Sequence, residues 1–191
     1  MRAALVVVVF GGFLGASAGP LGARPEERQL KVVTARGVPA AEAVSVYHQK
    51  GGKREVAVES AKLDAAVALP GEGPFEVWVK PKGGIAVKVV EKLEVKAGST
   101  HELKLGDVLG VVEVFGDNFP RAAKVVLTDP RDPGPGEKGH VAVQLASDYR
   151  VEMGVPPGVY AVWVVPANGA KAQRVEDSVR VQAGRSVRVG G

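Results

Sequence analysis

The sequence has no cysteine and few aromatic residues: two Trp, three Tyr and five Phe in 191 positions. Without cysteine, the chain cannot use thiol catalysis, disulfide bonds, thiolate zinc sites or lipid attachment through an N-terminal cysteine. Its net charge of +4 is too small to favour nucleic acid or an anionic membrane as a partner. Apolar residues make up 46% of the chain, enough to bury a core, and the length allows one or two domains. We therefore expect a globular protein that folds through its core alone.

The sequence has one long apolar run, at its N-terminus. Residues 3–14 are uncharged and follow Arg2, and residues 16–18 place small side chains at the minus-three and minus-one positions of a cleavage site. This layout is typical of a secretory signal peptide, whereas a transmembrane anchor needs roughly 20 apolar residues. We expect residues 1–18 to be a cleaved signal peptide and residues 19–27 a linker. The mature chain would then have no membrane span and would be periplasmic or extracellular.

The rest of the sequence contains one pattern twice. FEVWVKP at residues 75–81 and YAVWVVP at residues 160–166 share an aromatic residue, Val, Trp, Val and Pro at a constant offset of 85 positions. Further along, LEVKAGST at residues 93–100 corresponds to VRVQAGRS at residues 179–186. Self-similarity over about 80 residues predicts two copies of one structural unit. We place the first copy at residues 28–106 and the second at residues 107–191.

Within each copy, apolar and polar residues alternate between breaks rich in Gly, Pro, Asn and Asp, which predicts short antiparallel strands. The strands are expected at residues 30–34, 43–48, 55–58, 62–68, 75–79, 85–90, 92–96 and 101–105, and again at 111–115, 124–128, 141–145, 150–153, 159–164, 171–175, 178–181 and 186–189. Seven or so strands in about 80 residues suit two sheets packed face to face. The predicted fold class is all-β, with two tandem antiparallel Ig-like β-sandwiches after a cleaved signal peptide.

Each copy reads Gly-x-aromatic-x-Val-x-Val, then a Gly turn, then Val-x-Val-x-Ala-Gly-x-Thr/Ser. This pattern resembles the repeat of carboxypeptidase regulatory-like domains of the transthyretin-like (prealbumin-like) sandwich family, over most of both copies. The resemblance implies that fold, and such domains are usually non-catalytic modules beside enzymes, receptors or adhesins. The enzymatic hydroxyisourate hydrolases of the same fold end in Tyr-Arg-Gly-Ser, but the nearest text here is Tyr149-Arg150-Val151-Glu152. The resemblance therefore implies no catalytic residue.

The sequence after the predicted signal peptide carries no motif for catalysis or for a cofactor. A Gly-x-Ser-x-Gly elbow surrounds none of its serines, Ser45, Ser60, Ser99, Ser147, Ser178 and Ser186, and no Gly-rich loop leads into a Lys and a helix. His48, His101 and His140 are far apart in sequence and lack the close spacing that places two imidazoles on one metal. We therefore expect no enzyme activity, no cofactor and no bound metal.

Two tryptophans occupy equivalent positions in the two copies. If the faces that carry Phe75, Val77 and Tyr160 form the cores, then Trp78 and Trp163 lie on the opposite faces of their strands. There a Trp can stack on a sugar ring or anchor a protein partner. The alternative is that the duplication copied a Trp that covers its own sheet or packs between the domains.

Residues 129–140 form an insertion with no counterpart of equal length in the first copy. Asp129, Asp132 and Glu137 offer carboxylates of the kind that calcium binds, but their spacing matches no known calcium loop and three prolines stiffen the segment. A solvated loop is the simpler interpretation. Because loops on a rigid scaffold often carry binding residues, we retain these three residues and His140 as candidate partner contacts.

These observations predict a non-catalytic structural or protein-interaction module of a bacterial envelope or secreted assembly. The alternative is a carbohydrate-binding module that uses an exposed Trp and the loop at residues 129–140. The expected partner is a protein or a polysaccharide, and not a nucleic acid, because basic residues interleaved with aromatic ones are missing.

Overall fold

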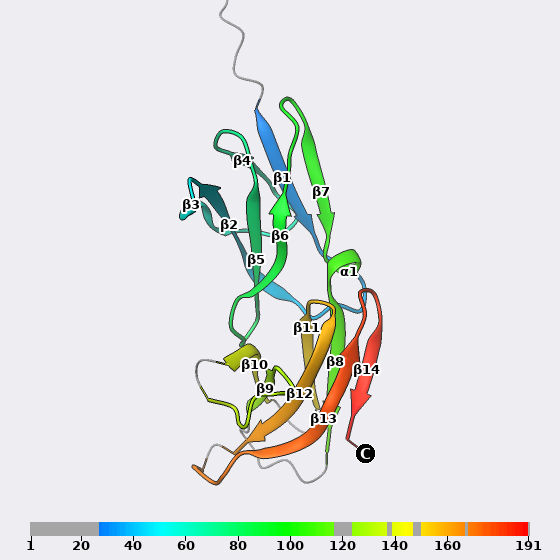
Figure 1. The fold of residues 1–191 in the computed structure, drawn as a ribbon. Helices are drawn as coiled ribbons and strands as arrows, with labels where there is room; N and C mark the ends of the chain where they lie inside the picture. The colour runs from blue at the N-terminus through cyan, green and yellow to red at the C-terminus, as the bar shows by residue number, and fades with distance from the viewer. Residues whose placement is uncertain (1–26, 117–123, 137–138, 147–149, 167, 191) are drawn as a thin grey trace, which may run out of the picture.

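The computed structural model describes residues 27–116, 124–136, 139–146, 150–166 and 168–190 (Figure 1). The predicted signal peptide, residues 19–26 of the predicted linker and Glu137 lie outside the described residues. The described chain is all-β apart from one short helix. Its elements are β1 (Arg28–Val33), β2 (Ala41–Lys50), β3 (Lys53–Ala61), β4 (Ala66–Leu69), β5 (Phe75–Pro81), β6 (Val87–Leu93), β7 (Thr100–Lys104), α1 (Leu105–Val108), β8 (Gly110–Phe115), β9 (Lys124–Thr128), β10 (His140–Leu145), β11 (Arg150–Val155), β12 (Gly158–Val165), β13 (Gln173–Val181) and β14 (Ser186–Val189).

The strands form four sheets, and each sheet takes its strands from one half of the chain. The first half has sheets of order β4-β1-β7 and β3-β2-β5-β6, and the second half has β11-β8-β14 and β10-β9-β12-β13. Adding seven to each strand number of the first half gives the order in the second half. The duplicated sequence thus corresponds to a duplicated topology, and the halves lie one above the other in Figure 1, joined through α1.

In each half the two sheets bury apolar side chains in a common cluster, which gives the structure β-sandwich character. The first cluster takes Leu30 from the three-stranded sheet and Phe75 and Val77 from the four-stranded sheet, and none of these side chains is exposed. Tyr160 belongs to the second cluster, so the predicted core faces of β5 and β12 are confirmed. Complete burial of such side chains contributes about 1.5–3 kcal/mol each.

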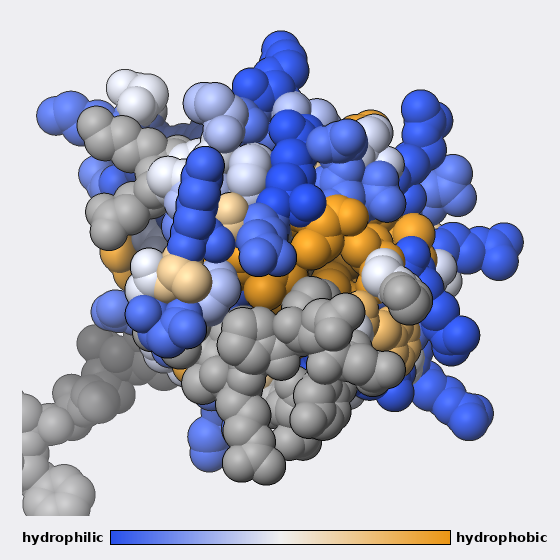
Figure 2. Space-filling view, turned by 90° about the horizontal axis from the view of Figure 1, so that it is seen from below, coloured by the Kyte–Doolittle hydropathy of each residue, from blue (hydrophilic) through white to orange (hydrophobic). Residues whose placement is uncertain are grey.

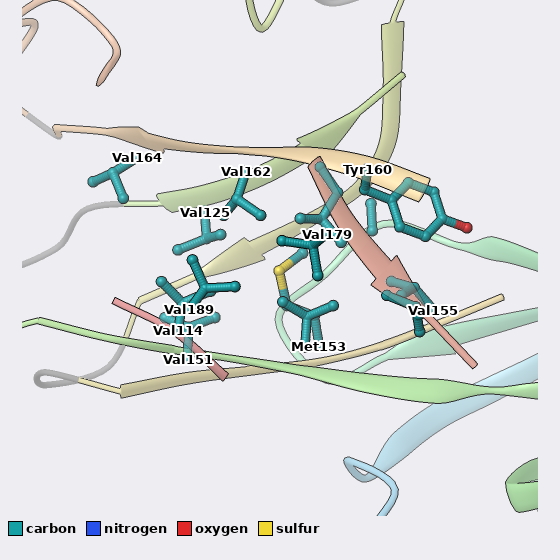
Figure 3. Close-up of a cluster of buried hydrophobic side chains, with 14 of the residues drawn as sticks. Val114, Val125, Val151, Met153, Val155, Tyr160, Val162, Val164, Val179 and Val189 are labelled. Atoms are coloured by element: carbon teal, nitrogen blue, oxygen red, sulfur yellow. The ribbon is translucent and has the colours of Figure 1, made fainter. Parts of the chain in front are cut away.

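One end of the molecule carries both hydrophilic and hydrophobic side chains on its surface. Figure 2 looks at the end formed by the second half: hydrophilic side chains project around its rim, and hydrophobic residues gather toward the middle. Figure 3 shows the interior of the same half, where Val114 and Val189 of the three-stranded sheet face Val125 and Val162 of the four-stranded sheet. Alternation along each strand therefore divides the side chains between core and solvent.

The prediction of wholly antiparallel sheets is wrong for two strand pairs. β1 pairs with β7 in parallel, and β8 pairs with β14 in parallel. These are the first and last strands of each half. No hairpin joins them, so no tight turn dictates that they run in opposite directions.

The predicted strand boundaries also need correction. Where strands were predicted at 85–90 and 92–96, the structure has the single strand β6, which begins at Val87 and ends at Leu93. Where strands were predicted at 171–175 and 178–181, it has the single strand β13, which begins at Gln173. Shifts of register in the β5–β6 and β12–β13 pairs interrupt the alternation that indicated two strands. The strand predicted at 62–68 begins only at Ala66, because Asp64 adopts a positive φ of 62° in a turn and accepts a hydrogen bond from the Thr34 N–H.

Helix α1 was not predicted from the sequence. It is four residues long and contains the predicted boundary between the copies at residues 106 and 107, which stays a prediction. No helix in the described part of the chain has the length and hydropathy that a membrane span requires.

Backbone hydrogen bonds join the two halves. The turn between β5 and β6 lies against β10, the edge strand of the second half: the Ile85 N–H donates to the Val143 carbonyl (3.2 Å), and the Leu145 N–H donates to the Gly83 carbonyl (3.3 Å). A Cβ atom on Gly84 would lie 2.8 Å from the Val143 carbonyl oxygen, so this approach requires glycine. The first half thus covers part of an open sheet edge of the second half.

Candidate functional site

Trp78 lies on the outer face of the sheet β3-β2-β5-β6, within a cluster of aromatic and charged side chains. Its indole Nε1–H donates to Glu76 Oε2 (3.1 Å). The guanidinium carbon of Arg54 lies 4.6 Å from the centre of the Trp78 ring and 3.6 Å from that of Tyr47. The Tyr47 and Trp78 rings meet edge to face, with centres 6.2 Å apart. The N–H and one face of the half-buried indole are therefore held in place, and its ring also packs against Tyr47.

Glu76 holds this cluster together electrostatically. Burial raises the pKa of its carboxyl group, but hydrogen bonds from Trp78 and Gln49 and the positive charges of Arg54 and Lys88 act against burial and outweigh it. The pKa of Glu76 therefore lies below its ordinary value. At neutral pH Glu76 is a carboxylate paired with Arg54 (Nε to Oε2, 3.4 Å).

Trp163 also lies on the face opposite the core, but it is only 8% exposed. It packs in a small apolar cluster with Val126 and Ala161, and its Nε1–H donates to the fully buried hydroxyl of Thr128 (3.1 Å). Arg174 lies over its ring at 5.4 Å. Trp163 thus covers its own sheet, as in the alternative interpretation, and offers little surface to a ligand.

Two substitutions between the copies explain this difference. Tyr47 of β2 lies opposite Glu76 of β5, and at the equivalent positions of the second copy Thr128 of β9 lies opposite Ala161 of β12. The first copy therefore places a carboxylate and a phenol where the second copy places a methyl group and a hydroxyl group. The outer face is polar and aromatic in the first half and apolar and closed in the second.

The loop at residues 129–140 makes contacts within itself and with β13. The side chain and backbone N–H of Arg131 bind the Asp129 carboxylate, at distances from 2.7 to 2.9 Å, and hold the pKa of Asp129 well below its usual range. A Cβ atom on Gly139 would lie 2.6 Å from Asp132 Oδ2, and Arg174 donates to the Pro130 carbonyl (2.9 Å). Asp129 is thus bound by Arg131, and Asp132 lies against Gly139. Among the described residues, no three His, Asp or Glu side chains form a group that could hold a metal ion.

The structure brings two of the predicted contact residues, Trp78 and His140, to one cleft between the halves. The cleft has a volume of about 440 Å³. It is lined from the first half by Trp78, Ala86, Val87 and Lys88, and from the second half by His140, Val141, Pro156 and Tyr160. Trp163, Asp129 and Asp132 do not line it.

The polar groups of the cleft have defined partners. His140 Nε2 lies 3.1 Å from the Pro135 carbonyl oxygen, which only accepts, so Nε2 carries a proton. The Tyr160 hydroxyl group donates to the Pro156 carbonyl (2.7 Å), and burial raises its pKa. Lys88 pairs with Glu91 (3.6 Å). His140 Nδ1, when the ring is neutral, and the Tyr160 oxygen are left as acceptors.

A second charged cluster lies on the outer face of the sheet β11-β8-β14. The largely buried carboxylate of Glu113 lies between Arg150 (3.5 Å) and Arg188 (3.3 Å). Both guanidinium groups also contact the ring of Phe115, at 5.1 and 5.6 Å. Every charge in this cluster is paired, so we regard it as a structural feature.

Sequence reasoning missed Arg54, Glu76, Pro156 and Tyr160 as residues of the site. Glu76 carried a usable signal, because it lies two residues before Trp78 and so on the same strand face. Tyr160 was interpreted as a core residue, which it is, and nothing in the sequence indicates that one side of its ring also reaches an interdomain cleft. Contacts between the halves depend on how the two halves pack against each other. The alternation of apolar and polar residues within one strand carries no information about that packing.

No protein-family model matches the chain, and no curated protein matches it. Among solved structures, the chain is similar to the Bacillus anthracis TIE protein, with 16% sequence identity and a TM-score of 0.31. The match covers 85% of this chain and 33% of that protein, so the chain spans about a third of its length. A TM-score of this size does not establish a shared fold, and we transfer no property from that protein.

Proposed function

We propose that the chain is an exported, non-catalytic module of two tandem transthyretin-like, Ig-like sandwiches that binds a protein partner in a bacterial envelope or secreted assembly. The identical strand order of the two halves and the resemblance to carboxypeptidase regulatory-like repeats support the tandem arrangement. The pairing of the largely buried carboxylates of Glu76 and Glu113 with arginines favours a binding role over catalysis.

The observation that carries this proposal is the edge strand β3. It lies at the end of its sheet, most of its side chains are exposed, and Val56 is 61% exposed. An edge strand presents unpaired N–H and C=O groups to which another extended chain can add. In the second half the equivalent strand is β10, whose edge already pairs with residues 83–85. The same position in the first half is therefore suited to receive backbone from a partner.

Site-specific cross-linking in producing cells tests this proposal. A photoreactive amino acid replaces Val56 in β3, and in a control it replaces Lys96, which is exposed in the turn between β6 and β7. We expect a discrete protein adduct from position 56 and none from position 96. No adduct from position 56, or the same adduct from both positions, contradicts the proposal.

The second candidate is carbohydrate binding, and one observation favours it. Trp78 and His140, 62 positions apart in the sequence and in different halves, line a single cleft with a fixed indole on one wall. Retardation of the purified protein in gels that contain a soluble polysaccharide tests this candidate, and unchanged mobility in every polysaccharide contradicts it.

A further inference from the structure

We propose that the cleft between Trp78 and His140 binds a neutral sugar ring, and that it selects neutral over acidic sugars. This inference rests on carbohydrate binding, the second candidate function. It concerns which sugars the cleft accepts and which side chains hold them.

The first step of the argument is the rigidity of the Trp78 wall. The indole N–H is held by Glu76 and one ring face by Arg54, and the ring also contacts that of Tyr47. Binding therefore costs little ordering of this side chain, which strengthens affinity. The volume of about 440 Å³ lies within the range of about 300–1,000 Å³ for small-ligand pockets and suits a ring better than a folded protein surface.

The second step is the hydrogen-bonding character of the cleft. Because His140 Nε2–H and the Tyr160 hydroxyl hydrogen are both donated to backbone carbonyls, each side chain retains acceptor capacity for the ligand. Lys88 adds a donor. Acceptors beside a flat aromatic wall complement a molecule that has an apolar ring face and hydroxyl donors around its edge. A sugar ring has this composition, whereas a hydrocarbon lacks the donors.

The third step is charge. Arg54, which lies over the Trp78 ring, and Lys88, which lies opposite Trp78 on β6, already have carboxylate partners. Arg54 pairs with Glu76 at 3.4 Å, and Lys88 pairs with Glu91 at 3.6 Å. An acidic sugar would have to compete with these carboxylates, and a carboxylate beside Glu76 would be repelled. The local balance of charge therefore favours a neutral ligand.

The test is affinity electrophoresis of the purified full chain in gels with a soluble neutral glucan, a soluble mannan or polygalacturonate. We expect at least one neutral polysaccharide to retard the protein and polygalacturonate to have no effect. Trp78→Ala should weaken that binding at least about tenfold. His140→Phe should weaken it about threefold to tenfold, and His140→Gln, which keeps an acceptor and a donor, should restore most of it.

Val175→Ser, at an exposed position on β13 outside the cleft, is the control and should bind as the unmodified protein does. Circular dichroism establishes that each variant is folded, and the two His140 variants test the cleft independently of Trp78. Retardation only by polygalacturonate, or by a neutral polysaccharide with no effect of the Trp78 and His140 variants, overturns this inference and leaves carbohydrate binding standing. Unchanged mobility in all three gels overturns both.

Discussion

The two tryptophans form a matched pair whose removal should have unequal effects on stability. A Trp side chain buries about 200 Å² when fully buried, worth about 5 kcal/mol at 25 cal/mol per Å². Trp163 is 8% exposed and donates to the fully buried Thr128, so Trp163→Ala should lower the free energy of unfolding by about 3–5 kcal/mol. Trp78 is half-buried, so the loss of packing and of its contact with Arg54 should cost about 2 kcal/mol.

Urea unfolding followed by far-ultraviolet circular dichroism measures both losses. In the Trp163→Ala protein, the fluorescence of Trp78 reports separately on the first half, whose midpoint should change little. A total stability of about 5–15 kcal/mol for a domain makes the difference between the variants easy to resolve. Equal losses, or a larger loss for Trp78→Ala, would refute the view that one indole supports its sheet while the other faces a cleft.

Three further perturbations test other parts of the structure. Because the pKa of Glu76 is depressed by folding, its contribution to stability is present above pH 4.5 and is lost as pH falls through the lower folded value. Glu76→Gln should therefore make urea midpoints less sensitive to acidification below pH 4.5, and an unchanged acid dependence contradicts this. Gly84→Val should place side-chain atoms against Gln144 and the adjacent backbone, and so weaken the contact between residues 83–85 and β10 by about 1–3 kcal/mol. The radius of gyration measured by X-ray scattering should increase, while circular dichroism should be unchanged. Glu113→Ala should cost about 1 kcal/mol in urea unfolding, and a neutral result would mean that its pairing with Arg188 adds nothing.

Much of the fold could be predicted because the signals that specify it are local. Alternation along β5 and β12 placed Phe75 and Tyr160 in the cores, and the structure confirms this. The repeat at an offset of 85 positions anticipated the shared strand order. The parallel β1–β7 and β8–β14 pairs could not be predicted. The relative direction of the first and last strands depends on how all the strands between them are arranged in the two sheets.

The candidate site was predictable only in part. The parity of the strands placed both indoles on outer faces, but their burial depends on cross-strand neighbours, namely Glu76 and Tyr47 in one copy and Ala161 and Thr128 in the other. The meeting of Trp78 with His140 depends on the junction between the halves. No local pattern in the sequence describes that junction.

The parallel first and last strands determine how the chain would respond to mechanical load. In each half, the entering strand and the leaving strand lie side by side and run in the same direction, with five paired positions for β1 and β7 and four for β8 and β14. A pull on the two ends of a half acts in opposite directions along these neighbouring strands. The hydrogen bonds between them then bear the force together in shear, instead of opening one after another from one end. Because the halves follow one another along the chain, tension passes through both shear-loaded pairs in series, and the weaker one sets the force that the molecule withstands.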